Sequence, residues 1–449
     1  VLFLVDRIEL ENQAKKNFIN YLSLDYHTVV FKENTDDWRK AEIVISTVQT
    51  LSFNNKYRQY FKPTDFSLLI ADESHRSING NYRAVFEYFL GYKLGLTATP
   101  KDYIKNVDVT KLKATDPRAW EKRQLLDSYK TFGCESGDPT YRYSLIDGVN
   151  DGYLVNPRVV DARTEITTQL LADEGYAVIN ETEDNDDEED VYYAKDFERK
   201  FFSEETNRMF VKTFMENAKR DPLSGEIGKS IIFCVSRKHA AKITQILNEF
   251  AEKLFPDKYY SDFAMQITSD VMNAQIYTIN FQNNNLSGTT KFLENYKSSK
   301  TRVCVTVGMM TTGYDCEDLL NIGFLRPIFS PTDFIQIKGR GTRKYEFTYK
   351  DNIAGTIHEY KENKDTFKLF DFFGNCEYFE EKFNYDEILI LPRTRSTGTG
   401  LPPIPPPGES VFENYDPDPI KFINETPVGF KGMKIDRMFF NKFESSVRE

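Results

Sequence analysis

The sequence contains Phe66-Ser-Leu-Leu-Ile-Ala-Asp-Glu-Ser-His-Arg-Ser77, an apolar run that ends on two adjacent carboxylates. Asp72 and Glu73 stand where a buried parallel strand would leave its sheet. Ligands of open α/β sheets gather outside the carboxyl ends of the strands, so acids at this position can hold a metal and orient a water molecule. A polar strand end would account for one acid, but not for the Ser-His-Arg segment that follows. The stretch therefore indicates a nucleotide-hydrolysing site at the edge of a parallel sheet.

Outward from this stretch, apolar runs alternate with amphipathic or polar segments along most of the chain, which is the pattern of βα units around a parallel sheet. Residues 8–21 and 196–220 have the spacing of amphipathic helices. The expected fold is α/β, with two lobes that each contain a parallel β-sheet flanked by helices. The expected strands are residues 1–5, 43–45, 66–70, 92–96, 230–235, 263–267, 302–307 and 321–325.

Length and composition agree with a globular protein of more than one domain, since 449 residues exceed what one hydrophobic core usually serves. No apolar stretch is long enough to span a membrane, and the N-terminus lacks the order of a secretory signal, so we expect a cytoplasmic protein. The five cysteines have no paired spacing, which favours reduced, mostly buried thiols. The net charge of -11 argues against a wholly basic surface. Much of the acidity lies in residues 181–190, so the charge does not exclude a local basic channel elsewhere.

Changes in composition predict three parts of the chain. Residues 1–155 are expected to form the first lobe, and residues 156–395 the second lobe with an acidic loop and a helical insertion. Residues 396–449 form a tail, in which Leu401-Pro-Pro-Ile-Pro-Pro-Pro-Gly408 has the composition of an extended linker, because successive prolines fix φ and remove backbone donors. Residues 434–447 could form the first helix of a C-terminal helical region, but they cannot form a domain alone.

Three further segments carry polar groups at expected strand or helix ends. Gly95-Leu-Thr-Ala-Thr-Pro100 brings two hydroxyls near the acids, although Thr-Ala-Thr-Pro alone is a common turn. Val307-Gly-Met-Met-Thr-Thr-Gly-Tyr-Asp315 contains glycines that permit a close approach to phosphate or ribose, with a plain strand-to-helix turn as the alternative. In Gln336-Ile-Lys-Gly-Arg-Gly-Thr-Arg343, Arg340 and Arg343 stand at i and i+3, so on a helical turn both can converge on a phosphate. A solvated basic face is the alternative, but glycines on both sides of Arg340 are poor choices for a helical surface.

Taken in order, these segments resemble the motifs of superfamily 2 helicases. Asp72-Glu-Ser-His75 resembles the DEAD/DEAH-type motif II, and Thr97-Ala-Thr99 resembles motif III. The segments that resemble motifs Ia, Ib, IV, V and VI are, respectively, residues 3–13, 46–50, 230–239, 306–315 and 336–343.

Within that superfamily, residues 1–395 resemble the restriction (R) subunit of type I restriction-modification enzymes. The segments that carry this resemblance are residues 72–77, 95–100, 143–155, 325–327, 338–343 and 367–373. The resemblance implies two RecA-like lobes with ATP and Mg2+ between them. It also implies an ATP-driven translocase that moves along double-stranded DNA before cleavage, together with modification (methyltransferase) and specificity subunits.

The same resemblance implies roles for individual residues. Asp72 would bind Mg2+ through water, and Glu73 would orient and deprotonate the water that attacks ATP. Arg340 and Arg343 would stabilise charge in the transition state. The residues expected to contact the nucleotide are Thr97, Thr99, Gly313, Asp315, Gln336 and Gly339. The residues expected to contact DNA, mainly at phosphates, are Arg7, Gln13, Thr47, Gln49, Thr50, Ser236, Arg237 and Thr306.

The chain departs from the family pattern at one point, because the phosphate-cradling motif Gly-x-x-x-x-Gly-Lys-[Ser/Thr] does not occur in it. In the family this loop precedes motif Ia and a nuclease domain lies further upstream, so we interpret the chain as an N-terminally truncated motor. We expect the chain alone to hydrolyse ATP poorly or not at all. Two alternatives stay open. One is another superfamily 2 protein, such as a type III restriction subunit or a repair helicase, and the other is a scaffold that binds DNA or proteins without hydrolysis.

Overall fold

The structure is a computed structural model that divides into two compact units, Val1–Arg142 (unit 1) and Tyr143–Glu449 (unit 2). The predicted end of the first lobe, residue 155, falls within unit 2, where the Val155 N–H donates to the Thr342 carbonyl over 2.7 Å. The predicted acidic loop, the proline-rich linker and the helix over 434–447 lie outside the described residues. The described residues are 1–6, 8–33, 37–74, 83–97, 132–134, 139–141, 143, 145–162, 168, 203–290, 293, 296–310, 314–329, 331–353, 356–383 and 424–427.

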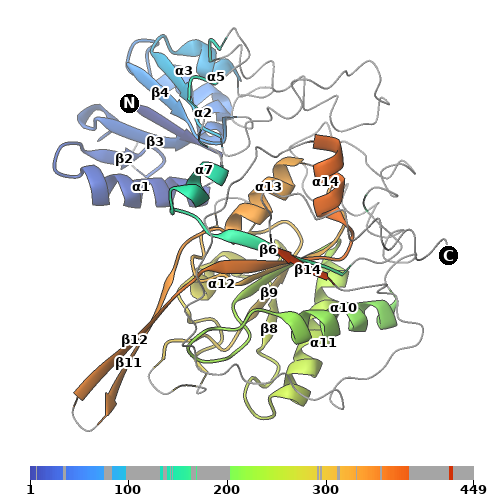
Figure 1. The fold of residues 1–449 in the computed structure, drawn as a ribbon. Coiled ribbons are helices and arrows are strands. Elements are labelled where there is room, and N and C mark those ends of the chain that lie inside the picture. The colour runs from blue at the N-terminus through green and yellow to red at the C-terminus, as the bar shows by residue number, and fades with distance from the viewer. Residues whose placement is uncertain are drawn as a thin grey trace. The chain divides into compact units, whose positions relative to one another are not determined.

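Unit 1 is built on a five-stranded parallel sheet in the order β2-β3-β1-β4-β5 (Figure 1). The strands are β1 (Leu2–Val5), β2 (Thr28–Val30), β3 (Ile43–Thr47), β4 (Leu68–Ala71) and β5 (Tyr92–Gly95). Four of them confirm predicted strands, whereas β2 is too short to show a period in the sequence. The central strands β1 and β3 are almost wholly buried, as expected of parallel strands covered on both faces.

Helices and turns of unit 1 cover the two faces of this sheet. Alternation along β1 sends Phe3 toward α1, where its ring lies edge-on to Phe18 with centroids 5.1 Å apart, and sends Leu2 and Leu4 into the core on the opposite face. That second core is rich in aromatic rings, including Trp38, Phe61, Phe66 and Phe89. The helices are α1 (Ile8–Leu22), which confirms the predicted helix, α2 (Val48–Ser52), α3 (Lys56–Tyr60) and α5 (Arg83–Tyr88), with 3-10 turns at Asp37–Lys40 and Phe53–Asn55.

Unit 2 is built on a seven-stranded sheet in the order β14-β6-β13-β10-β7-β9-β8. Its parallel strands are β6 (Asn156–Asp161), β7 (Ser230–Cys234), β8 (Ala264–Gln266), β9 (Val303–Thr306), β10 (Asn321–Leu325) and β13 (Thr366–Asp371). The strands β7 to β10 confirm the predicted second group. The strand β14 (Asn424–Pro427) pairs antiparallel with β6, so these residues of the expected tail join the sheet.

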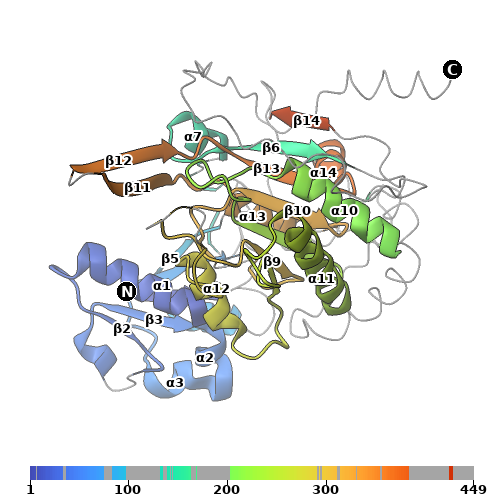
Figure 2. The same cartoon turned by 90° about the horizontal axis from the view of Figure 1, so that it is seen from below.

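Helices of unit 2 lie on both faces of its sheet (Figures 1 and 2). α10 and α11 share one core with the sheet, where Phe214 meets Phe370 of β13 with ring centroids 5.2 Å apart. On the other face, Phe334 of α13 packs between Phe324 of β10 and Phe379 of α14, with centroids 5.8 and 4.5 Å apart. The helices are α7 (Leu145–Asn150), α10 (Glu204–Asn217), α11 (Arg237–Leu254), α12 (Ala274–Gln282), α13 (Pro331–Arg340) and α14 (Asn375–Phe383).

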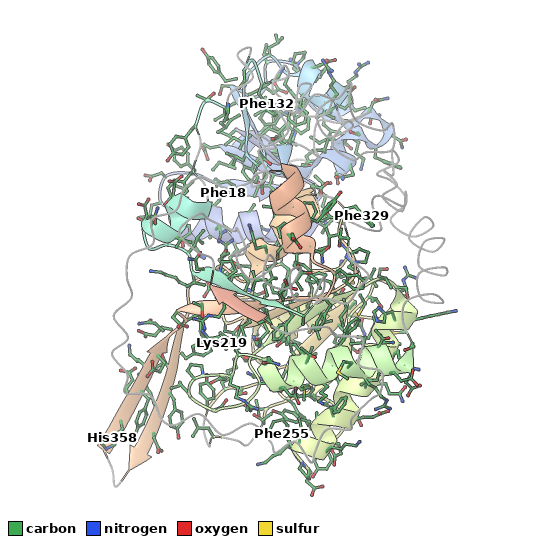
Figure 3. The ribbon with its side chains drawn as sticks, turned by 45° about the vertical axis from the view of Figure 1, so that its right-hand side comes forward. Phe18, Phe132, Lys219, Phe255, Phe329 and His358 are labelled. Carbon is green, nitrogen blue, oxygen red and sulfur yellow. The ribbon has the colours of Figure 1, made fainter. Side chains whose placement is uncertain are left out.

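A long antiparallel hairpin, β11 (Glu346–Ile353) and β12 (Thr356–Asn363), follows α13 and was not predicted. It extends away from the sheet of unit 2, and His358 lies on it (Figures 1 to 3). Lys350 and Glu359 face each other across the strands and form an ion pair of 3.3 Å. Across the described parts of both units, no helix is long and apolar enough to cross a membrane.

Candidate functional site

The two acids of the quoted stretch lie at the carboxyl end of β4. The Asp72 N–H donates to a β1 carbonyl (2.9 Å), and Asp72 Oδ1 accepts from the Glu73 N–H over 3.0 Å. Glu73 has a φ of 46°, in the left-handed region that residues with side chains rarely adopt, so the chain turns sharply there. The Ser74 N–H then donates to the Leu96 carbonyl (2.9 Å). The structure therefore brings the acids and Thr97 to the ends of neighbouring strands.

Asp6 is a third carboxylate at this edge, and the sequence analysis missed it. It follows β1, which lies between β3 and β4 in the sheet. Burial raises the pKa of Asp72 above its ordinary value and the negative charge of Asp6 raises it further, whereas the hydrogen bond from the Glu73 N–H opposes the rise. Gln49 Nε2 donates to Asp6 Oδ1 over 3.4 Å. Strand order, which the sequence does not show, is what places Asp6 beside Asp72.

The chemistry of this edge fits a cation that binds through few protein ligands. Within the described residues, no three His, Cys, Asp or Glu side chains form a metal site by themselves. Mg2+ is typically held by one or two carboxylates while water and phosphate oxygens complete its shell. Asp72, with Asp6 close by, supplies hard oxygen ligands of this kind.

Three of the predicted DNA contacts lie at the end of β3 and in the helix α2 that follows it. Thr47 is the N-cap of α2, and its Oγ1 accepts from the Thr50 N–H over 3.1 Å and lies 2.7 Å from Thr50 Oγ1. The Thr47 side chain is buried, so its hydroxyl serves the cap, whereas Gln49 is exposed and Thr50 is half-buried. Gln13, on α1, is also half-buried. Gln49 is therefore the most accessible of these four candidates.

The two candidate arginines of unit 2 both bind the segment before β10. Arg340 Nη1 donates to the Tyr314 carbonyl, and Arg343 Nε donates to Asp315 Oδ1 over 3.1 Å. The Arg343 and Asp315 side chains are 51% and 29% exposed, so this ion pair is open to solvent. The structure thus brings three predicted residues together, Asp315 with both arginines close by.

One expectation about these arginines is wrong, because α13 ends at Arg340 and Arg343 does not lie on the same helical turn. The helix ends where Thr342 Oγ1 donates to the Gly339 carbonyl (2.8 Å). At Gly341 the chain runs so close to Phe367 that an added Cβ would lie 2.2 Å from a ring atom. Gly341 is therefore needed because the backbone passes close to the Phe367 ring. The Gly-Arg-Gly pattern in the sequence indicated such a requirement.

Gln336 is a buried polar side chain on α13. It is 5% exposed, and neither Oε1 nor Nε2 has a hydrogen-bond partner among the described residues. A buried amide in this state lowers stability unless a ligand or water satisfies it. Gln336 and Arg340 stand at i and i+4, so they share one helix face. At Gly339 an added Cβ would meet no described atom within 4 Å, so packing does not require that glycine.

The remaining DNA candidates lie at the carboxyl ends of neighbouring strands in unit 2. Ser236 follows β7 and caps α11, its Oγ accepting from the His239 N–H over 3.0 Å. The exposed Arg237 donates from Nη2 to Ser269 Oγ (2.9 Å). Thr306, at the end of β9, is fully buried and donates its hydroxyl to a carbonyl three residues later. Of these three, Arg237 is the one whose side chain reaches solvent most freely. The predicted residues Arg7, Thr99 and Gly313 lie outside the described residues.

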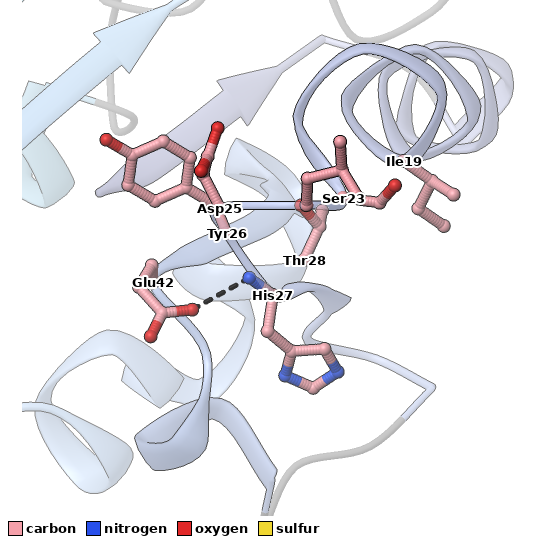
Figure 4. A pocket seen from close by; sticks show the side chains of 8 residues that line it. Ile19, Ser23, Asp25, Tyr26, His27, Thr28 and Glu42 are labelled. Atoms are coloured by element: carbon pink, nitrogen blue, oxygen red, sulfur yellow. Dashed lines mark hydrogen bonds between the residues drawn. The ribbon is translucent and has the colours of Figure 1, made fainter.

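A surface pocket of unit 1 lies away from the candidate site (Figure 4). Its lining includes His27 and Glu42, which directly precede β2 and β3, so it marks the amino edge of the sheet, opposite the acids. Glu42 Oε2 accepts from the His27 N–H over 2.7 Å. The pocket is lined by Ile19, Ser23, Leu24, Asp25, Tyr26, His27, Thr28 and Glu42.

Comparisons with known proteins show which proteins this chain is similar to. A family model described as "Type III restriction enzyme, res subunit" matches residues 1–102. The type I restriction enzyme EcoAI endonuclease subunit of Escherichia coli is 28% identical over 431 residues, which are 90% of this chain and 47% of the relative. The EcoKI endonuclease subunit of Escherichia coli K12 is 25% identical over 88% of this chain and 32% of the relative. This chain therefore spans about half or less of these curated relatives.

A solved structure supports the fold. It is a fragment assigned as the HsdR subunit of a type I restriction enzyme from Vibrio vulnificus YJ016, with a TM-score of 0.50 and 22% identity. The alignment covers 85% of this chain and 54% of that one. At this identity the likeness concerns the fold, which in both is of the α/β class. The chain is therefore similar in sequence to the endonuclease subunits of type I restriction enzymes, and it shares the α/β fold of the Vibrio vulnificus fragment.

Proposed function

We propose that this chain is the motor of a type I restriction enzyme R subunit, an ATP-dependent translocase that moves double-stranded DNA before cleavage. The observation that carries the proposal is the position of Asp72 and Glu73 at the carboxyl end of β4, in a chain homologous to endonuclease subunits over 90% of its length. The modification and specificity subunits of such a complex are its proposed partners, and ATP and Mg2+ its proposed ligands.

In unit 1, Asp72 would hold Mg2+ through water. The bound cation would supply positive charge to the phosphate oxygens. The raised pKa of Asp72 means that burial and Asp6 disfavour its charged form, so the carboxylate gains stability when a cation lies beside it. Glu73, at the sharp turn of the backbone, would orient the attacking water and accept its proton.

In unit 2, Arg340 and Arg343 would supply positive charge to the transition state, a role worth on the order of a thousandfold or more in rate. Each now donates to an oxygen of the segment before β10, Tyr314 O or Asp315 Oδ1. A phosphate oxygen would have to replace these acceptors. The buried amide of Gln336 has no partner among the described residues, and it would contact the nucleotide when the arginines bind the phosphate.

DNA would be held at its phosphates. The accessible candidates are Gln49 in unit 1 and Arg237 in unit 2. Amide and guanidinium groups bind phosphates without reading bases, which suits an enzyme that must move along any sequence.

The test is ATP hydrolysis by the full-length protein, with and without linear duplex DNA. We expect stimulation by duplex and displacement of a third strand from a downstream triplex, both lost on Glu73→Gln with duplex binding retained. The control is Glu87→Gln, which changes an exposed glutamate paired with Arg83 over 2.7 Å and should leave hydrolysis unchanged.

Other outcomes point to other functions. Stimulation by single strands or RNA alone would identify a different superfamily 2 helicase. Duplex binding with no hydrolysis in the full-length protein would identify a scaffold. A second candidate, a type III restriction subunit, is favoured by the family model for residues 1–102, and it predicts cleavage without a type I modification partner.

A further inference from the structure

Glu11 is a fully buried carboxylate that joins two separate segments of unit 1. It lies on α1 and is 0% exposed. Its Oε1 accepts from the Thr47 N–H over 2.7 Å, across 36 positions of the sequence. Its Oε2 forms an ion pair of 3.2 Å with Lys32 Nζ. Oε2 accepts no hydrogen bond among the described residues, so the Lys32 charge is what compensates it, and a carboxylate buried in this way is costly to place and needs a reason.

The register of the sheet supplies a structural reason. Val30 of β2 faces Ile45 of β3, so a longer β2 would bring Lys32 opposite Thr47. β2 ends at Val30, and the end of β3 loses its neighbour on that side. Glu11 occupies the place of the absent strand, because its Oε1 accepts the hydrogen bond of the Thr47 amide while its Oε2 lies in an ion pair with the Lys32 ammonium.

We propose that Glu11 is a positioning residue for DNA, one that holds the turn carrying Gln49 and Thr50 at a fixed place relative to α1. This inference rests on the proposed function, because the position of Gln49 and Thr50 matters for DNA binding only if the chain binds DNA. Thr47 is both the acceptor that caps α2 and the residue whose amide Glu11 binds. α1 carries a further candidate contact, Gln13. The phosphates of a DNA strand are regularly spaced, so the two segments must keep their separation to bind neighbouring phosphates together.

The Lys32 ammonium also neutralises the charge of Glu11. An isolated carboxylate beside a phosphate-binding turn would repel the phosphate, and burial would strengthen the repulsion by lowering the local dielectric. Lys32, 38% exposed, approaches Glu11 from the solvent side and cancels this charge. Glu11 can therefore accept a backbone hydrogen bond as an ion without opposing DNA binding.

The experiment measures duplex DNA affinity of the chain by fluorescence anisotropy, with amide hydrogen exchange of residues 46–50 and the thermal midpoint as companion readouts. Glu11→Leu removes the acceptor, so we expect faster exchange at Thr47 and an affinity at least about tenfold weaker, the equivalent of one lost hydrogen bond. Glu11→Gln keeps an acceptor oxygen for the Thr47 amide and should retain both protection and affinity. Glu33→Gln, at an exposed glutamate that pairs with Lys15 over 2.6 Å, is the matched control.

A second pair of variants carries the test even if Glu11→Leu does not fold. Lys32→Met exposes the uncompensated Glu11 charge, so it should weaken duplex binding, and adding Glu11→Gln to it should restore most of the loss. A Lys32 that touched DNA directly would give the same loss in both backgrounds, and that result would overturn the inference. Folded Glu11→Leu with unchanged affinity would overturn it as well. If the unaltered chain fails to bind duplex DNA while residues 46–50 remain protected, the proposed function fails, and the inference fails with it.

Discussion

Arg343 Nε donates to Asp315 Oδ1 over 3.1 Å, so two residues proposed for nucleotide chemistry are paired with each other inside unit 2. The neighbouring Arg340 likewise donates to the Tyr314 carbonyl. In this structure, both guanidinium groups therefore form hydrogen bonds to oxygen atoms of unit 2 itself. Under the proposed function, a nucleotide phosphate would have to displace these oxygens, so the strength of the Arg343–Asp315 pair bears on that proposal.

We expect the Arg343–Asp315 pair to add little to stability. Both side chains reach solvent, and exposed ion pairs typically contribute about 0–1 kcal/mol. A double-mutant cycle with Asp315→Asn and Arg343→Gln, followed by urea unfolding, should give a coupling free energy below about 1 kcal/mol. A coupling well above about 2 kcal/mol would instead make the pair structural and weaken its proposed role in hydrolysis.

Gln336 gives a prediction of opposite sign, because replacing it should stabilise the protein. Its amide is buried without a partner among the described residues, so Gln336→Met removes a desolvation cost and keeps the side-chain volume. We expect the free energy of unfolding to rise by about 1–2 kcal/mol, measured by urea unfolding.

The control for that change is Gln245→Met on α11. Gln245 is exposed and donates to Glu249 over 2.9 Å, so its replacement should alter stability by no more than about 0.5 kcal/mol. If Gln336→Met lowers stability instead, the amide has a partner in solution, and its availability to a ligand is refuted.

Four strands of unit 1 and the strands β7 to β10 of unit 2 could be predicted from the sequence, because strands buried on both faces are nearly continuous apolar runs. The strands β2, β6, β11, β12, β13 and β14 were not predicted. Among them, β2 has only three residues, β6 contains Pro157 and Arg158, and Lys368 interrupts β13. Strand order could not be predicted at all. It alone makes Asp6 a neighbour of Asp72 and leaves the end of β3 open for Glu11.

In the candidate site, residue types indicate which side chains have suitable chemistry, whereas packing decides which of them are accessible to a ligand. Asp72, Glu73 and Arg340 could be proposed as site residues because charged side chains stand at a strand end or a helix end, and Arg343 because it follows Arg340 after three residues. Thr47 and Thr306 have suitable hydroxyls, but each hydroxyl is used within the fold, one in a cap and one on a backbone carbonyl. Which polar groups remain accessible depends on such local hydrogen bonds, and these follow from backbone geometry that a sequence pattern does not specify.

Asp72 gives a prediction about pH. Its folded-state pKa is raised, first by burial and then by Asp6, above the ordinary value of 3.8. A raised pKa contributes stability below the unfolded value and loses it as pH rises through the folded value. Asp72→Asn should therefore raise the free energy of unfolding at pH 7, with a gain that shrinks toward pH 4. The measurement is urea unfolding at each pH, and a gain independent of pH would rule out a titration of Asp72 as its source.

His239 gives the complementary prediction. It is buried on α11 with Nε2 3.0 Å from Asn207 Oδ1, and burial lowers its pKa to about 3. The unfolded chain takes up a proton below about pH 6.5 that the folded histidine refuses, so stability is full above that pH and falls by up to about 1.4 kcal/mol per unit below it. Relative to His239→Gln, the unaltered chain should lose about 2 kcal/mol between pH 6.5 and 4.5, measured by urea unfolding at each pH. A profile for His239→Gln that runs parallel to that of the unaltered chain would show that His239 takes up its proton alike in the folded and the unfolded chain, and would contradict the lowered pKa.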